Sequence, residues 1–192
     1  MTRKITLLSS LILALSVTTV YAEDTIPSAT IHFTGSVIVP SCEFDNGGEQ
    51  TVTLGSFPTT DFPVVGAEAT GTSFTITLNN CPTPTSSLDR VQMTFTGPTV
   101  TSHPELLQVS KITTEDAGDT AATNIGIAIN LGLESSTSKL KLDGTDEQIY
   151  IDLPPAADTQ ISQDFFACYV AYAIPVTAGP ADADMVVNLL YR

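Results

Sequence analysis

Three cysteines are the residues with the most evident chemistry in this sequence. Cys42 and Cys81 lie 39 positions apart, each beside a strand-like run. A bridge between them would stabilise the fold by roughly 4 kcal/mol through closure of that loop. Neither belongs to a Cys-x-x-Cys pair or a Cys/His cluster, so the spacing disfavours zinc. The sequence alone leaves the pairing open, and Cys168 is either a half-buried free thiol or half of an intermolecular disulfide.

Histidines and nucleotide-binding motifs offer little support for catalysis. His32 is expected inside a strand and His103 in a loop before Pro104, and both are interpreted as ordinary polar residues. No P-loop, G-x-G-x-x-G or nucleophile elbow occurs. The sequence therefore predicts a protein that is not an enzyme and that needs no cofactor.

Two acidic clusters could in principle bind calcium or act as paired carboxylates. Neither has EF-hand spacing, so solvated loops are the better interpretation and no metal is expected. Glycoside hydrolysis by two carboxylates depends on a distance that only geometry can test. The absence of Trp weakens the case for a sugar-stacking surface. The clusters are Glu115, Asp116 and Asp119, and Asp143, Asp146 and Glu147.

Charge and length narrow the class of protein. The 192 residues carry 7 Lys and Arg against 21 Asp and Glu, a formal net charge of −14. Nucleic acids and anionic lipids both bind basic surfaces, so neither is an expected partner. The length suits one ordinary domain.

The first 22 residues have the pattern of a secretory signal peptide. Arg3 and Lys4 precede a mostly apolar run at positions 5–20, and Ala22 ends a segment of small residues suited to signal peptidase. The run is too short and wrongly flanked for a stable transmembrane helix, although an uncleaved anchor is the alternative. Cleavage would leave a soluble mature protein of about 170 residues outside the cytoplasm.

Short β-strands recur along the rest of the chain. Alternating or β-branched runs are separated by turn formers such as Asp143-Gly144 and Gly179-Pro180. About eight such strands predict an all-β sandwich of two sheets. The expected strands cover residues 31–39, 50–54, 73–78, 91–95, 125–129, 139–142, 165–174 and 184–191.

The two ends of the predicted domain have complementary character. In the last strand one face carries apolar residues, and the chain is expected to stop while still inside that strand. At the other end Ala29, Ile31 and Phe33 share one face of an extended segment. An unpaired edge attracts another strand, so this combination fits β-strand addition between subunits. Pairing of the first strand within its own domain is the alternative. The last strand's apolar face comprises Met185, Val187, Leu189 and Tyr191.

Motifs along nearly the whole mature chain resemble those of one family. Five motifs occur in the order and spacing of that family. They are the segment 30–37, Cys42 with residues 50–55, residues 74–81 ending in Cys81, residues 122–127 and the penultimate Tyr191. The sequence is similar to the type 1 fimbrial rod pilins of chaperone–usher pili. Two departures are Ala29, at a position where the family usually has glycine, and Cys168, since the family normally has no third cysteine there.

This resemblance implies a fold, an assembly mechanism and a set of residues. The fold would be an incomplete immunoglobulin-like sandwich that lacks its last strand and is completed by a donated one. A periplasmic chaperone would lend a strand, which an outer-membrane usher exchanges for the N-terminal extension of the next subunit, giving a head-to-tail polymer. The implied organisation is a signal peptide at 1–22, a donor-strand extension at 23–34 and a pilin domain at 35–192.

The resemblance also assigns individual residues. Cys42 and Cys81 would form the structural disulfide. The donor strand would use Ile26, Ala29, Ile31 and Phe33. The chaperone would pair with a C-terminal strand comprising Met185, Val187, Leu189, Tyr191 and Arg192, the last through its carboxylate.

The expected function is thus that of a structural subunit of an adhesive surface fimbria, reached through the periplasm. Its partners would be neighbouring subunits, the chaperone and the usher. The alternative is a tip or secreted carbohydrate-binding β-sandwich module. About 170 mature residues leave no room for both a lectin domain and a pilin domain.

Overall fold

The computed structural model describes residues 29–35, 41–110, 120–136, 138–157 and 159–192. It comprises two units, residues 1–37 and residues 38–192. The predicted signal peptide, Ile26 and the acidic cluster at 115–119 lie outside the described residues. Within the described ranges no helix is long and apolar enough to cross a membrane.

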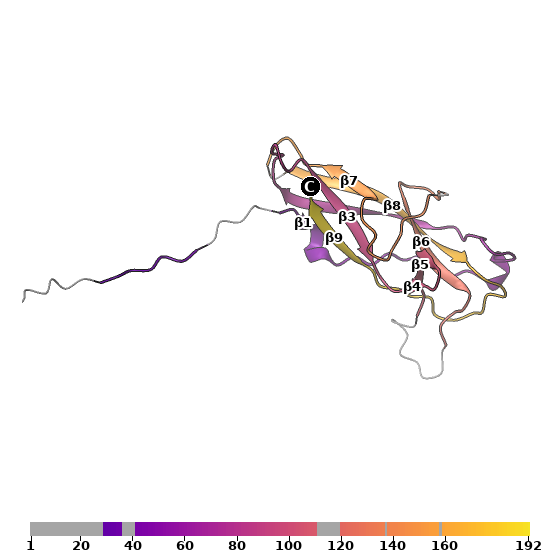
Figure 1. The fold of residues 1–192 in the computed structure, drawn as a ribbon. Coiled ribbons are helices and arrows are strands. Elements are labelled where there is room, and N and C mark those ends of the chain that lie inside the picture. Colours follow the sequence, from indigo (N-terminus) through magenta and orange to yellow (C-terminus); the bar gives the residue numbers. More distant parts are fainter. Residues whose placement is uncertain (1–28, 36–40, 111–119, 137, 158) are drawn as a thin grey trace, which may run out of the picture. The chain divides into compact units, whose positions relative to one another are not determined.

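The larger unit consists of two antiparallel sheets (Figure 1). The six-stranded sheet has the order β1 (Glu43–Phe44), β2 (Thr72–Cys81), β8 (Thr159–Ala171), β6 (Ile125–Leu131), β5 (His103–Gln108) and β4 (Thr99–Val100). The three-stranded sheet has the order β7 (Ile149–Asp152), β3 (Arg90–Thr96) and β9 (Val186–Tyr191). Two short 3-10 turns, η1 (Asp45–Gly48) and η2 (Thr59–Asp61), are its only helical segments among the described residues. The predicted all-β, two-sheet fold is confirmed.

The core lies between the sheets and follows the period-two alternation of their strands. Val91, Met93 and Phe95 of β3 are fully buried and face the six-stranded sheet. Phe165 of β8 joins the layers, since its ring stacks on Phe74 and meets Phe95 edge-on, each at 5.5 Å between centroids. Aromatic pairs of this kind add about 0.5–1.5 kcal/mol each to the burial of their surface.

A smaller apolar cluster covers the outer face of the six-stranded sheet. Ala128 on β6 and Cys168 on β8 are register partners within it and are buried. A half-buried ion pair joins Lys139 Nζ to Glu68 Oε1 at 2.6 Å. Burial raises the pKa of the Cys168 thiol to about 11. Cys168 is a free cysteine, so the half-buried thiol of the sequence interpretation is in fact a fully buried one.

Three expected strands differ in the structure. Residues 29–35 have no regular secondary structure, so His32 lies in no strand, while 36–39 are outside the described residues. Residues 50–54 form no ladder, although Val52 and Leu54 are half-buried and Thr51 and Thr53 are exposed as the alternation predicted. The physical reason is an open groove, described below, that separates this segment from β9. Residues 139–142 make only isolated bridges.

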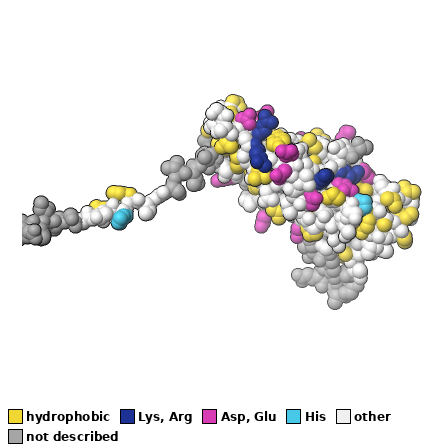
Figure 2. All heavy atoms as spheres, viewed as in Figure 1, with side chains coloured by type: hydrophobic (Ala, Val, Ile, Leu, Met, Phe, Trp, Pro, Cys, Tyr) yellow, Lys and Arg dark blue, Asp and Glu magenta, His cyan; other side chains and the backbone are white. Residues whose placement is uncertain are grey.

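Four strands were missed by the sequence patterns, namely the two-residue strands β1 and β4 and the longer strands β5 and β7. His103 begins β5 and does not lie in a loop, and Pro104 is tolerated because it stands near the start of this strand. β7 is an edge strand of four residues, too short for a recognisable alternation. Acidic side chains occur at several separate places on the face shown in Figure 2 and do not gather into one patch.

An open apolar groove as the candidate functional site

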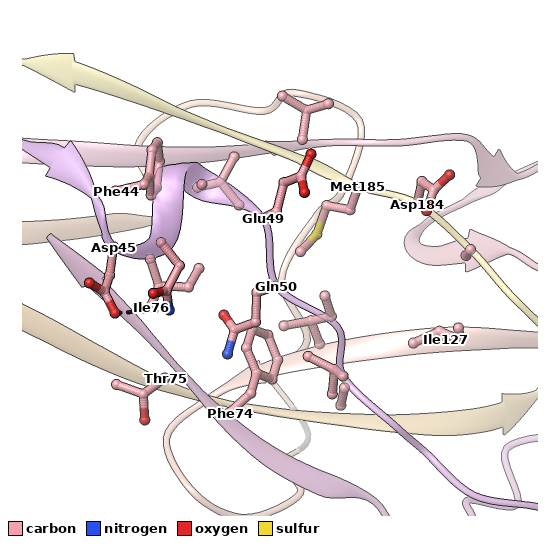
Figure 3. A pocket seen from close by; sticks show the side chains of 18 of the residues that line it. Phe44, Asp45, Glu49, Gln50, Phe74, Thr75, Ile76, Ile127, Asp184 and Met185 are labelled. Atoms are coloured by element: carbon pink, nitrogen blue, oxygen red, sulfur yellow. Dashed lines mark hydrogen bonds between the residues drawn. The ribbon is translucent and has the colours of Figure 1, made fainter.

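A groove of about 520 Å³ opens into the core of the larger unit. One wall is the segment 183–187 leading into β9, and the other comprises lining residues between Phe44 and Leu54. Its floor combines apolar side chains of four strands. Figure 3 shows Phe74 and Ile76 of β2, Ile127 of β6 and Met185 around this space. The floor residues are Phe74, Ile76, Leu107, Ile127, Ile129 and Ala167.

β9 presents an unpaired edge beside the groove. Among the described residues it pairs with β3 alone. Arg90 and Arg192 exchange both backbone hydrogen bonds, at 3.3 and 3.0 Å. Since donors and acceptors alternate along an antiparallel ladder, the backbone groups of Val187, Leu189 and Tyr191 point away from β3. This edge can therefore accept a further strand.

The side chains of the final strand follow the predicted alternation. Val187, Leu189 and Tyr191 are partly buried against the core, and so is Met185 just before β9. Val186 and Leu190 are exposed on the other face. A strand that added to this edge would lie over the groove floor and pack against these inward side chains.

One end of β9 is tied to the first part of the domain. Cys42 and Cys81 form a disulfide, which joins the segment before β1 to the end of β2. The Cys42 N–H donates a hydrogen bond to the Tyr191 hydroxyl at 2.5 Å. Burial raises the pKa of Tyr191, although hydrogen bonds from Cys42 and Ser41 oppose this rise. Tyr191 thus connects the three-stranded sheet to the disulfide.

This connection predicts a stability effect for Tyr191→Phe. The substitution leaves the buried Cys42 N–H without its acceptor, so the free energy of unfolding should fall by about 1–2 kcal/mol. Urea unfolding of the purified variant measures the change. The matched control is Tyr150→Phe, because Tyr150 is 41% exposed on β7. Equal effects of the two substitutions would show that the Tyr191 hydrogen bond contributes nothing.

The smaller unit exposes the apolar face of its described segment. Ile31 is 73% and Phe33 92% exposed, which is unusual for side chains of this size. Ala29 lies in the same extended segment. The structure therefore shows that Ile31 and Phe33 have apolar surface to bury.

The groove-lining residues Phe44, Val52 and Leu54 were not predicted as site residues. The alternation in residues 50–54 was the available signal, because it marked Val52 and Leu54 as facing the core. It could not show that an open groove separates them from β9, since that separation is a tertiary property.

Among the described residues, the candidate catalytic groups do not assemble a reactive centre. His103 Nδ1 lies 3.0 Å from Glu105 Oε1 on β5, and the exposed Asp143 carboxylate accepts hydrogen bonds from Thr145 that hold its pKa below the usual value. Among the described residues no group of three His, Cys, Asp or Glu side chains could hold a metal ion.

The immunoglobulin-like sandwich of this chain has the fold of pilus subunits whose structures have been solved. The P pilus rod subunit PapA has a TM-score of 0.59 at 18% identity, covering 80% of this chain and all of that one. A chaperone–usher pilus structure, reported for the molecular basis of rod uncoiling, has a TM-score of 0.59 at 20% identity. The match covers 88% of this chain and 100% of that chain.

Sequence comparison identifies the family. Residues 31–192 match the family model described as Fimbrial protein. The fimbrial subunit type 1 of Salmonella typhimurium is 32% identical over 164 residues, which are 85% of this chain and 82% of the relative. The type 1 fimbrial protein C chain of Escherichia coli is 30% identical over 172 residues, or 89% and 87% of the two chains.

This chain belongs to the Fimbrial protein family. It is a structural subunit of a cell-surface fimbrium, and its family is not enzymatic.

Proposed function

We propose that this chain polymerises head to tail by donor-strand exchange. The extension at residues 23–34 of one copy inserts into the groove of another, with Ile26, Ala29, Ile31 and Phe33 as its donor residues. The observation that carries the proposal is the groove along the unpaired edge of β9. Such a contact joins two different surfaces of the same chain, so it extends into a filament and does not close into a dimer.

The energetics favour insertion of the exposed segment. Burial of a side chain such as Ile31 or Phe33 contributes about 1.5–3 kcal/mol each. The inserted backbone would also pair with the outward-directed groups of Val187, Leu189 and Tyr191. Both sources of stability are absent from an isolated copy, whose groove floor is open to water.

A periplasmic chaperone would cover the same groove before assembly. An apolar groove left open would promote aggregation, so a temporary strand is needed after signal peptide 1–22 is removed and the chain enters the periplasm. The chaperone strand would lie along Met185, Val187, Leu189 and Tyr191, with the Arg192 carboxylate in a basic cleft. An outer-membrane usher would then exchange this strand for the extension of the next pilin domain (35–192).

A carbohydrate-binding module is the less supported function. A sugar site needs polar groups and aromatic platforms arranged together, whereas the groove floor consists of aliphatic side chains and Phe74. The alternative of a tip or secreted lectin therefore has no specific feature of the groove in its favour.

A cysteine pair in one chain tests the insertion. In filaments of the Phe33→Cys, Met185→Cys variant, mild oxidation should join successive copies into a covalent ladder on denaturing gels. The native thiols should not interfere, because Cys42 and Cys81 are bridged and Cys168 is buried. Each single variant is the control. Filaments that form normally but give no ladder would contradict the proposal, and a cross-linked monomer would indicate insertion into the chain's own groove.

A further inference from the structure

Asn130 on β6 is fully buried, yet neither polar atom of its side-chain amide has a hydrogen-bond partner among the described residues. A buried amide without partners is costly, so its presence in a folded domain suggests that the group has a task. Alternation along β6 places Asn130 on the outer face of the six-stranded sheet, together with Ala128. Its register partner on β8 is Phe166, which packs against the outer apolar cluster that contains Cys168.

Lys139 lies directly opposite Asn130. The two residues form an antiparallel bridge, and beside it the Leu140 N–H donates a 2.8 Å hydrogen bond to the Ile129 carbonyl. Hydrogen bonds that flank a pair mark the kind of antiparallel pair whose side chains lie closest, with Cβ atoms about 4.5–5.5 Å apart. The Lys139 side chain therefore starts next to the Asn130 amide, and its flexible four-carbon stem can bring Nζ to the amide carbon Cγ.

Glu68 supplies a carboxylate at the Lys139 amine. Glu68 forms a bridge with Val170 on the same outer face, and its Oε1 lies 2.6 Å from Lys139 Nζ. The Ser135 hydroxyl donates a hydrogen bond to Glu68 Oε2 at 2.5 Å. Burial raises the pKa of Glu68, but the hydrogen bonds from Lys139 and Ser135 hold it below its ordinary value. Glu68 is therefore an ionised carboxylate, fixed in position, that can accept a proton from Nζ.

The nearby thiol of Cys168 does not compete with this amine. Burial, together with the charge of Glu68, raises the pKa of the thiol to about 11, so it stays protonated at neutral pH. Lys139 acts on the same thiol in the opposite direction, so the ion pair lies close to Cys168 and to the apolar cluster around it. A partly apolar setting disfavours the charged forms of both groups and so favours proton transfer between them.

We propose that Lys139 and Asn130 join spontaneously in an isopeptide bond, with Glu68 as the catalytic residue. Glu68 takes a proton from the Lys139 ammonium, and the free amine attacks Cγ of Asn130. As the bond from Cγ to Nδ2 breaks, Nδ2 takes that proton from Glu68 and leaves with the bonding electron pair as ammonia. The new amide nitrogen gives its surplus proton to Glu68, which passes it to the ammonia. The net products are one amide bond and one ammonium ion, and no oxidant, metal or other reactant is consumed.

The bond would anchor the segment that connects the two sheets. Beyond Lys139 this segment also pairs with the end of β3, since the Gly97 N–H donates to the Leu142 carbonyl and the Gly144 N–H to the Phe95 carbonyl, at 2.9 and 2.8 Å. Cross-linking at Lys139 would fix the start of this segment to β6 of the six-stranded sheet. The inference concerns the covalent structure of one copy, so it does not rest on donor-strand insertion.

Mass spectrometry of subunits recovered from filaments of the full chain tests the cross-link. The denatured subunit should be lighter by one molecule of ammonia than its mature sequence with the Cys42–Cys81 disulfide requires. A glutamate-specific protease cuts after Glu134, between the two linked residues, and the resulting peptides 116–134 and 135–147 should remain joined. A wild-type subunit of full mass whose two peptides separate would overturn the proposal.

Two variants assign the roles of the residues. Lys139→Arg keeps a charge beside Glu68 but has no amine that could react, so it should have full mass and separate peptides. Glu68→Gln keeps the size of the side chain but not the base, and its cross-linked fraction should fall by about 10-fold or more, since general bases typically contribute at least that much. The wild-type measurement decides the proposal even where a variant fails to assemble.

Each variant can also contradict the assignment. An undiminished loss of ammonia in Lys139→Arg would show that the reaction occurs elsewhere, for example as a cyclic imide at Asn46-Gly47, and would overturn the cross-link. An unchanged cross-linked fraction in Glu68→Gln would overturn the role of Glu68.

Discussion

A chain that lacks residues 23–33 is expected to fold and bind its chaperone but to be absent from filaments. The deletion removes Ala29, Ile31 and Phe33, whose burial in another copy would supply most of the apolar contact with the groove. The groove and the edge of β9 belong to the other unit and stay intact. The measurement is the amount of chain in sheared filaments compared with the amount that copurifies with the chaperone.

Point variants of the extension make this expectation quantitative. Phe33→Ala should weaken insertion by about 2–3 kcal/mol, or roughly 30–160-fold in an equilibrium between copies, because the variant has no ring to bury in the groove, whereas the Phe33 ring is 92% exposed before insertion. Phe33→Leu keeps an apolar side chain and is the matched control. Normal filaments from the deleted chain would show that the extension is not the donor.

Val187→Asp changes the acceptor side of the same contact and should prevent the groove from accepting a donor strand. Val187 lines the groove and faces the core, so a carboxylate there would be buried without a partner, at a cost of several kcal/mol. Asn188→Asp is the control, since it adds the same charge to the exposed face of the same strand. Both the chaperone complex and the filament should be lost for Val187→Asp only.

Folding must be separated from binding in this comparison. The Cys42–Cys81 disulfide and the circular dichroism of the denaturant-free protein report whether the Val187→Asp variant has folded. A folded variant that assembles as well as Asn188→Asp would show that the groove is not the acceptor site.

The strands predicted best from the sequence were those in which the alternating apolar residues are buried on one face. Residues 73–78, 91–95 and 125–129 became β2, β3 and β6 because their apolar residues face the same core. β5 was missed because Pro104 and Glu105 interrupt its pattern, and its pairing with β6 compensates for them. Short edge strands such as β7 carry too little pattern to be recognised.

The groove itself was only partly predictable. The unpaired edge followed from the alternating Met185, Val187, Leu189 and Tyr191 near the end of the sequence. Its opposite wall could not be inferred, because residues 50–54 have a strand pattern yet no ladder partner among the described strands.

The two links at Cys42, its disulfide to Cys81 and its hydrogen bond to Tyr191, have a mechanical consequence. Tension along a filament built by strand insertion would enter each domain through the extension and reach Cys42. From there the disulfide to Cys81 carries the force into the ten-residue strand β2, and the hydrogen bond to Tyr191 carries part of it into β9. The pull would thereby be divided between both sheets. The covalent path should hold after the Tyr191 hydrogen bond has broken.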